Sequence, residues 1–395
     1  MQRLNLYIIL LFLFISSTFN CCRGSNTTAK AVTGAEQLSE YVPDIENRKV
    51  GLIVNQTSIV DGSHLVDLLL SKGIQVKKIF TPEHGFRGDV EAGDSINNSI
   101  DKKTGIPIIS LYGKNKKPTK ENLSGIDVLI FDIQDVGCRF FTYISTMHYA
   151  MEACAENNIP LIVLDRPNPN GDYIDGPVLK PELKSFVGMH PIPIVHGCTV
   201  GELAQMINGE GWLEGKKKCK LKVVPVKNYR HSDRYVLPVK PSPNLPNQAS
   251  VRLYPSLCLF EATTVSIGRG TEFPFQVAGF PDKRFGSFAF TPQSIKGVSA
   301  KPMHEGKQCF GIDLRKEAFD AKFTLSYFIQ FFNQFENPDL FWSSKRWIDL
   351  LTGDPKFYFQ ICDKKSEVEI RKTWQPDLVK YKAMRKNYLL YPDFE

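Results

Sequence analysis

Residues 127–132, Asp127-Val128-Leu129-Ile130-Phe131-Asp132, form a short run with a nearly continuous apolar centre. Such a run is typical of a strand that is covered on both faces of a sheet. A helical pattern follows at residues 143–157, and a second apolar run follows at residues 159–165. Strand, helix and strand at this spacing predict parallel strands joined by a crossover helix.

The same rhythm continues on the N-terminal side of this unit. Strands are predicted at residues 49–54, 75–80 and 106–111, with a helix at residues 64–72. We therefore predict a doubly wound α/β domain over residues 46–248.

The pattern of apolar runs changes after the proline-rich stretch at residues 241–246. We interpret this stretch as a hinge or an extended crossing. Beyond it the apolar runs are less regular. Residues 288–292 and 309–314 are predicted to pair in an antiparallel sheet, and residues 323–335 and 343–351 to be helical. This pattern predicts a smaller α+β domain over residues 249–395.

The first 22 residues have the pattern of a secretory signal. Arg3 supplies a positive charge, and the apolar run of residues 4–19 is short for a membrane span. Cys21 and Cys22 follow, and either could be the lipid-modified first residue of a bacterial lipoprotein. We expect an exported protein, periplasmic or anchored to the envelope by lipid, and soluble after the signal.

Charge and cysteine content narrow the expected partners and the redox chemistry of the protein. The formal net charge is +7, and most lysine runs, such as residues 114–117, are interpreted as solvated surface. A basic balance also favours an anionic polymer as partner, and for an exported protein nucleic acid is a poor one. Seven further cysteines are scattered without CxxC spacing, so we expect them to be buried apolar residues rather than a disulfide framework.

Dense polar segments follow three successive predicted strands. They begin at Thr81, Asp132 and Asp165. Because ligands of such sheets bind beyond the carboxyl ends of the strands, these loops are predicted to share a cleft.

The first and second loops carry the candidate acids. Glu83 could act as a general acid if burial raises its pKa, or it could cap the turn or pair with Arg87. His84 could be a general base, a metal ligand or a donor to substrate, with a structural hydrogen-bonding role as the alternative. Glu91 and Asp135 are further carboxylate candidates, with a solvated loop as the alternative for Glu91.

The remaining candidates are predicted to contact substrate, because a sugar needs several planar donors and acceptors. The alternative is a set of salt bridges and turns that brace the loops. Near the second domain, Gly268 and Gly270 would let Arg269 point into the cleft. The predicted contacts are Asp132, Gln134, Arg139, Tyr143, Asp165, Arg166, Asn168 and Arg269.

Signatures for other chemistry are missing from the sequence. There is no GxGxxG after the first strand, no P-loop and no GxSxG. The histidines show no HExxH spacing. We therefore predict no cofactor and no metal.

Four motifs, taken in order, resemble the NamZ family of exo-β-N-acetylmuramidases, formerly a family of unknown function. They are residues 81–88 (TPEHGFRG), residues 132–137 (DIQDVG) with Arg139, Phe141 and Tyr143, residues 165–169 (DRPNP), and residues 260–263 (FEAT) through 266–271 (SIGRGT). One departure is Ala262-Thr263-Thr264, where the family often has Gly-Thr-Asn; it touches no proposed catalytic group.

The resemblance implies a Rossmann-like N-terminal domain, a smaller C-terminal domain and a cleft between them. It implies release of N-acetylmuramic acid from the non-reducing end of peptidoglycan fragments, in cell-wall turnover or recycling, with Glu83 as the favoured catalytic residue. Glu91, Asp135, His84 or the acetamido group of the substrate would then supply the second reacting group.

This substrate carries a lactyl carboxylate, so a selective pocket needs a cation, and Arg139, Arg166 and Arg269 are the candidates. Phe141 or Tyr143 could form an apolar wall for the N-acetyl group. Two alternatives are a non-catalytic peptidoglycan-binding lipoprotein and another cell-wall hydrolase, such as an esterase or amidase.

Overall fold

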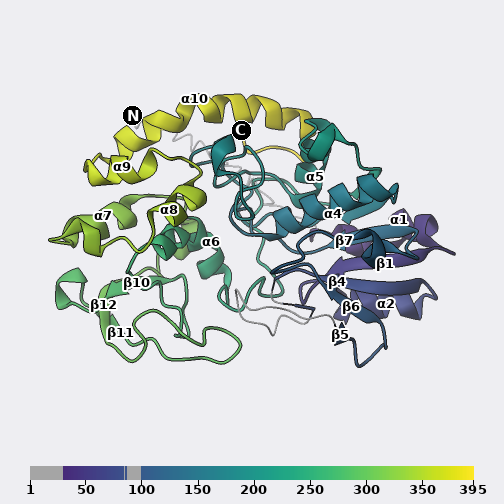
Figure 1. Cartoon of the computed structure of the whole chain (residues 1–395), viewed down its shortest axis with the longest axis horizontal. Helices are drawn as coiled ribbons and strands as arrows, with labels where there is room; N and C mark the ends of the chain where they lie inside the picture. Colours follow the sequence, from purple (N-terminus) through teal and green to yellow (C-terminus); the bar gives the residue numbers. More distant parts are fainter. Residues whose placement is uncertain (1–29, 84, 87–98) are drawn as a thin grey trace, which may run out of the picture. The chain divides into compact units, whose positions relative to one another are not determined.

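Six parallel strands form the centre of a sheet, and a short antiparallel strand extends one edge of it. The computed structural model describes residues 30–83, 85–86 and 99–395, and the predicted signal segment lies outside them. Figure 1 shows the sheet on the right of the view. Its strands, in chain order, are β1 (Lys49–Val54), β4 (Gln75–Thr81), β5 (Ser99–Ile100), β6 (Pro107–Ser110), β7 (Val128–Asp132), β8 (Leu161–Leu164) and β9 (Leu221–Val224).

The order of the strands across the sheet is β5-β6-β4-β1-β7-β8-β9. Counted along the chain, the six parallel strands therefore lie in the order 3-2-1-4-5-6, which is that of the Rossmann fold. The order reverses at β1, which lies between β4 and β7. Ligands of such sheets bind at this reversal, so the loops after β4 and β7 are the ones to examine.

Helices cover both faces of the sheet because successive side chains of a strand point to opposite faces. In β1, Val50 and Leu52 pack with residues of α1 (Leu38–Ile45) and α2 (Leu65–Ser71). Ile53, next along the strand, packs with α4 (Tyr143–Asn157) and α5 (Val200–Gly209). The predicted doubly wound α/β architecture is confirmed.

The C-terminal part of the chain holds a small antiparallel sheet and a set of helices. Strand β12 (Cys309–Asp313) lies between β10 (Val277–Phe280) and β11 (Phe288–Phe290), so the predicted antiparallel pairing is confirmed. Helix α6 (Gln248–Leu257) leads into this part. The helices that follow are α7 (Ser326–Gln334), α8 (Lys345–Thr352), α9 (Phe357–Cys362) and α10 (Glu367–Arg385).

Shorter elements complete the described chain. β2 (Ile59–Val60) and β3 (Ser63–His64) form a two-stranded hairpin, and α3 (Lys120–Leu123) is a single turn. The 3-10 helices are η1 (Gly34–Glu36), η2 (Pro181–Leu183), η3 (Glu214–Lys216), η4 (Cys258–Ala262), η5 (Lys283–Phe285), η6 (Ala318–Asp320), η7 (Pro338–Leu340) and η8 (Lys386–Tyr388).

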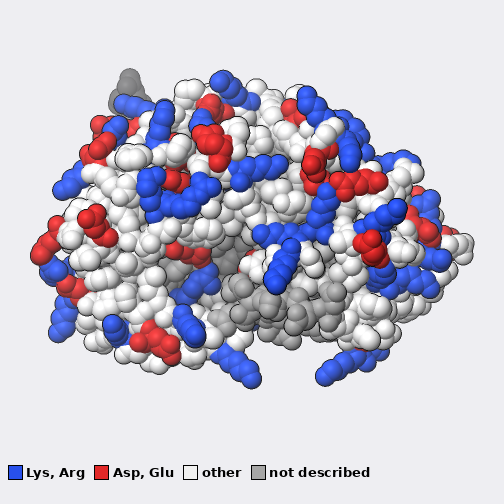
Figure 2. Space-filling model, in the orientation of Figure 1, with Lys and Arg blue, Asp and Glu red and all other residues white. Residues whose placement is uncertain are grey.

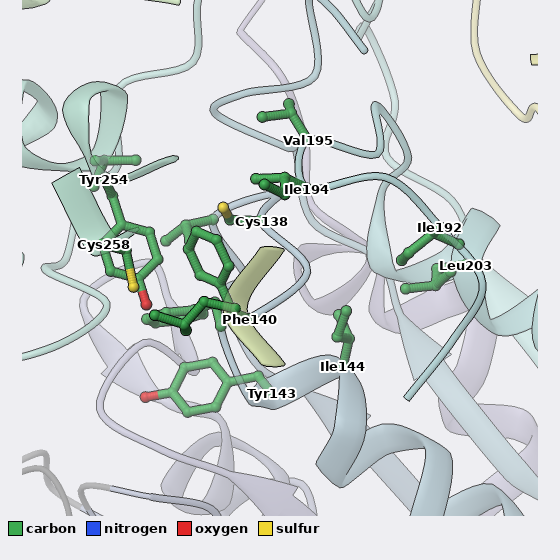
Figure 3. Close-up of a cluster of buried hydrophobic side chains, with 14 of the residues drawn as sticks. Cys138, Phe140, Tyr143, Ile144, Ile192, Ile194, Val195, Leu203, Tyr254 and Cys258 are labelled. Carbon is green, nitrogen blue, oxygen red and sulfur yellow. The ribbon is translucent and has the colours of Figure 1, made fainter. Parts of the chain in front are cut away.

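One apolar core joins the two parts, and residues Ala31–Glu395 form one compact unit. Figure 3 shows Tyr254 and Cys258 beside Phe140 and Cys138. The rings of Phe140 and Tyr254 meet edge to face with centroids 5.4 Å apart. The domain boundary predicted between residues 248 and 249 stays a prediction. Residues on the two sides of this boundary pack in the same apolar core.

Helix α10 also holds the two parts together. Arg371 pairs with Asp175 at 2.6 Å, and the Tyr381 hydroxyl donates to the His196 carbonyl at 2.6 Å. The proline-rich stretch at residues 241–246 contains a tight turn, closed by the Leu245 N–H on the Ser242 carbonyl at 3.0 Å.

The cysteines are placed as predicted. Six of the seven in the described chain are buried, Cys362 is partly exposed, and all seven are free thiols. Within the described residues, no helix is both long and apolar enough to span a bilayer.

Candidate active site

A cavity of about 640 Å³ opens beyond the carboxyl ends of the strands, between the loops of the sheet and the C-terminal part. Its size is in the range of ligand-binding pockets. Glu83, after β4, and Thr142, before α4, line it from the side of the sheet, and Tyr254 and Arg269 line it from the opposite side. Figure 2 shows this face hollowed near its centre, with basic side chains on both sides of the hollow.

Glu83 is held in the cavity by its neighbours. The Thr142 hydroxyl donates to Glu83 Oε2 at 2.9 Å. Gly85 has a φ of 75°, a conformation that favours glycine, and its N–H donates to the Pro82 carbonyl at 3.2 Å. This tight turn sets the direction in which Glu83 leaves the strand end.

Tyr112, which follows β6, is the second group beside Glu83. Burial raises the pKa of Tyr112 first, and the charge of Glu83 and a side-chain hydrogen bond with it raise it further. Tyr112 therefore stays a neutral donor at any ordinary pH. Neither Tyr112 nor Thr142 is among the predicted site residues.

Much of the cavity wall is apolar and aromatic. Phe141, one of the two predicted wall residues, lines the cavity, and Tyr143 does not. The other aromatic side chains of the wall are Phe140, Phe186, Tyr254, Phe260, Phe275 and Trp347.

Of the ten predicted site residues that the structure describes, Glu83 and Arg269 line this cavity and the other eight do not. His84 and Glu91 lie outside the described residues. Gly268 and Gly270 flank Arg269 with φ of 75° and 80°, as the predicted tight backbone requires. Arg269 pairs with Glu261 at 2.5 Å, and its guanidinium lies 4.9 Å from the centre of the Phe275 ring.

Asp132 and Arg166 form a buried two-pronged ion pair. Arg166 donates from Nε to Asp132 Oδ1 at 2.6 Å and from an Nη atom to Oδ2 at 2.9 Å. Arg139 is also fully buried, and it donates to the carbonyls of Pro177, Ile192, Leu351 and Thr352 at 2.6–2.9 Å. The two arginines thus hold loops together inside the protein. This placement does not favour their predicted contact with a substrate carboxylate, which stays a prediction.

Asp165, Asn168 and Tyr143 likewise face the protein. Asp165 accepts hydrogen bonds from Thr199, Gly201 and Tyr391, while burial raises its pKa to about 6. Asn168 donates to the Cys198 carbonyl at 2.8 Å. The Tyr143 hydroxyl donates to the Pro241 carbonyl at 3.0 Å.

Gln134 and Asp135 occupy the turn after β7. Gln134 donates to the carbonyls of Asp135 and Pro167, each at 2.8 Å. Asp135 Oδ2 accepts from the Gly137 N–H at 2.6 Å, and Oδ1 has no hydrogen-bond partner among the described residues. Burial raises the pKa of Asp135 to about 7, so this carboxyl can exchange a proton near neutral pH.

No group of three or more His, Cys, Asp or Glu side chains is arranged to hold a metal ion in the part of the chain that the structure describes. Among the described residues, the groups that line the cavity are two carboxyls, hydroxyls, an amide, two cations and aromatic rings. Together with the α/β fold, they define a protein that binds a polar ring compound against an apolar wall and presents a carboxyl group to it.

The comparisons with known proteins agree with that class. Residues 50–249 match the model described as exo-beta-N-acetylmuramidase NamZ, N-terminal, and residues 252–391 match the C-terminal one. The chain is 39% identical over 390 residues, 93% of each chain, to the peptidoglycan beta-N-acetylmuramidase NamZ of Bacillus subtilis (strain 168).

Two crystal structures of DUF1343 family proteins from Bacteroides fragilis are also similar. The first has a TM-score of 0.85 and 44% identity, covering 92% of this chain and 100% of the other. The second has a TM-score of 0.78 and 32% identity, covering 91% and 99%. The chain belongs to the NamZ family of exo-β-N-acetylmuramidases.

Proposed function

We propose that this protein is a glycosidase that releases N-acetylmuramic acid from the non-reducing end of peptidoglycan fragments, in cell-wall turnover or recycling. Membership of the NamZ family supports the reaction. The observation that carries the proposal in the structure is Glu83, a carboxyl at a strand end that lines a cavity of about 640 Å³. A purely binding protein would need no such acid, and that alternative is not favoured.

Glu83 protonates the glycosidic oxygen as the bond to the leaving sugar breaks. Glycoside cleavage requires a general acid at this oxygen. Without protonation the second sugar would have to leave as an alkoxide, which is a poor leaving group. Thr142, which donates to Oε2 at 2.9 Å, and Tyr112 fix the direction of the carboxyl. A fixed direction matters because proton transfer needs hydrogen-bond reach.

The second reacting group stays a prediction. His84 and Glu91 lie outside the described residues. Asp135 has a pKa of about 7, which suits a base, but it does not line the cavity. Glu261 is the second carboxyl among the described residues of the lining, and it is paired with Arg269 at 2.5 Å. Attack by the acetamido group of the substrate needs no second carboxylate, and it stays the alternative to a second catalytic side chain.

The aromatic wall gives the sugar its binding surface. Phe141, Tyr254 and Trp347 lie on the lining of the cavity. Aromatic faces bury the apolar C–H surface of a pyranose and the methyl of an N-acetyl group without needing hydrogen bonds of their own.

We propose further that the chain is exported, on the strength of Arg3 and the apolar run of residues 4–19. The periplasm is the expected location, with a lipid tether at Cys21 or Cys22 as the alternative.

The direct test is chromophore release from para-nitrophenyl β-N-acetylmuramide, with the β-N-acetylglucosaminide run beside it. We expect selective cleavage of the muramide by the wild-type protein. A folded protein that cleaves neither glycoside, nor a muramyl disaccharide, would contradict the proposed reaction.

A further inference from the structure

Recognition of the terminal sugar rests on one chemical feature. N-acetylmuramic acid differs from N-acetylglucosamine by a lactyl ether that carries a carboxylate. An enzyme that prefers the muramide therefore needs a positive charge where that carboxylate lies in the cavity. The inference below rests on the proposed function.

The three arginines predicted for this purpose are already engaged. Arg139 is fully buried beneath the loops, with its donors on four backbone carbonyls. Arg166 is bound to the buried carboxylate of Asp132. Arg269 reaches the cavity, but Glu261 lies 2.5 Å from it, so that its charge is largely compensated.

Lys116 is the other cation that lines the cavity among the described residues. It belongs to the loop after β6, at the same edge of the sheet as Glu83. Among the described residues no carboxylate lies within ion-pair distance of Lys116, whereas its neighbour Lys117 pairs with Glu152 and Glu156. The Lys116 ammonium lies 4.5 Å from the centre of the Phe186 ring.

This arrangement suits a bound anion. The Phe186 ring attracts the ammonium and limits its positions without neutralising its charge. Lys116 is half-buried, so the charge is partly shielded from water and acts over a short distance. We propose that Lys116 is the specificity-determining residue that binds the lactyl carboxylate of the terminal N-acetylmuramic acid.

The test compares two substrates that differ only in this charge: para-nitrophenyl β-N-acetylmuramide and its lactyl carboxamide. A hydrogen bond to a charged group is worth a factor of about 10–100 in binding. For Lys116→Met we expect KM for the acid to rise about 10- to 100-fold with kcat nearly unchanged. Cleavage of the carboxamide should be unaffected, and that activity also reports that the variant is folded.

Two control variants separate the alternatives. Lys114→Met removes an exposed charge of the same loop that does not line the cavity, and we expect wild-type kinetics on both substrates. Arg269→Gln removes the compensated cation. The proposal is overturned if Lys116→Met keeps the preference for acid over carboxamide, above all if Arg269→Gln abolishes it. A folded wild-type protein that cleaves neither substrate, nor a muramyl disaccharide, would instead refute the proposed function.

Discussion

Two groups of polar residues around the carboxyl edge of the sheet, one of them including Arg269 from the facing C-terminal part, look alike in the sequence and differ in the structure. The brace residues, Asp132, Arg139, Asp165 and Arg166, are buried and have their charges met by carbonyls, hydroxyls or each other. The cavity residues, Glu83, Lys116 and Arg269, lie on the lining of an open space. The comparison shows that polar residues after a strand form a binding site only where their side chains line a cavity.

The largest difference between the two groups is expected in stability. Arg166→Met leaves the carboxylate of Asp132 buried without its partner, which costs about 3–5 kcal/mol of unfolding free energy. Arg269→Met, a matched change in the cavity, breaks a pair with side chains 29% and 23% exposed and should cost about 0–1 kcal/mol. Urea unfolding of both variants measures the two values.

A compensating variant sharpens this prediction. Replacing both Asp132 and Arg166 by apolar residues of similar size should recover much of the loss, because no charge is then left unpaired. Equal costs for Arg166→Met and Arg269→Met would remove the distinction between brace and cavity residues.

A smaller effect, dependent on pH, is expected at Glu152, a buried acid of α4. Burial alone would raise the pKa of Glu152, but hydrogen bonds with His148 and the Glu214 N–H, together with the charges of His148 and Lys117, lower it to about 2. The folded value lies below the unfolded one of about 4.3. The resulting stability is therefore present above pH 4.3 and is lost as pH falls towards 2.

We expect Glu152→Gln to cost about 2–3 kcal/mol at pH 7, and the cost to shrink between pH 4 and pH 2. Glu156→Gln is the matched control on the same helix, with a side chain 28% exposed, and should cost less than about 1 kcal/mol. Unfolding followed across this pH range measures both. A cost for Glu152→Gln that does not change with pH would contradict the assignment.

The α/β half of the fold could be predicted from the sequence. Its strands are continuous apolar runs, and its helices have apolar residues at helical spacing. The strand at residues 49–54 and the helix at residues 143–157 match β1 and α4 residue for residue. The C-terminal part was harder. Helix α10, the longest in the described chain, was not predicted, although Ile370, Trp374 and Leu378 have helical spacing and are buried. Its charged exposed faces and the internal Pro376 obscure that period.

The site was predicted in part, for a related reason. The strand-end rule located Glu83, and the glycines of residues 268–270 located Arg269. The same rule applied to the strand at residues 106–111 would have pointed to Tyr112 and Lys116, but the lysine run at residues 114–117 was interpreted as solvated surface. Which strand-end side chains turn inward to brace the loops depends on partners far apart in the sequence, such as Leu351 and Tyr391, and no local pattern reveals them.

The central claim is that Glu83 is the catalytic acid of this cavity, and kcat of Glu83→Gln measured beside its unfolding midpoint tests it most directly. Loss of a general acid predicts a fall in turnover of about 10²- to 10⁴-fold with substrate binding kept and an unchanged midpoint. Turnover within a few-fold of wild type, from a variant of normal stability, would contradict the account.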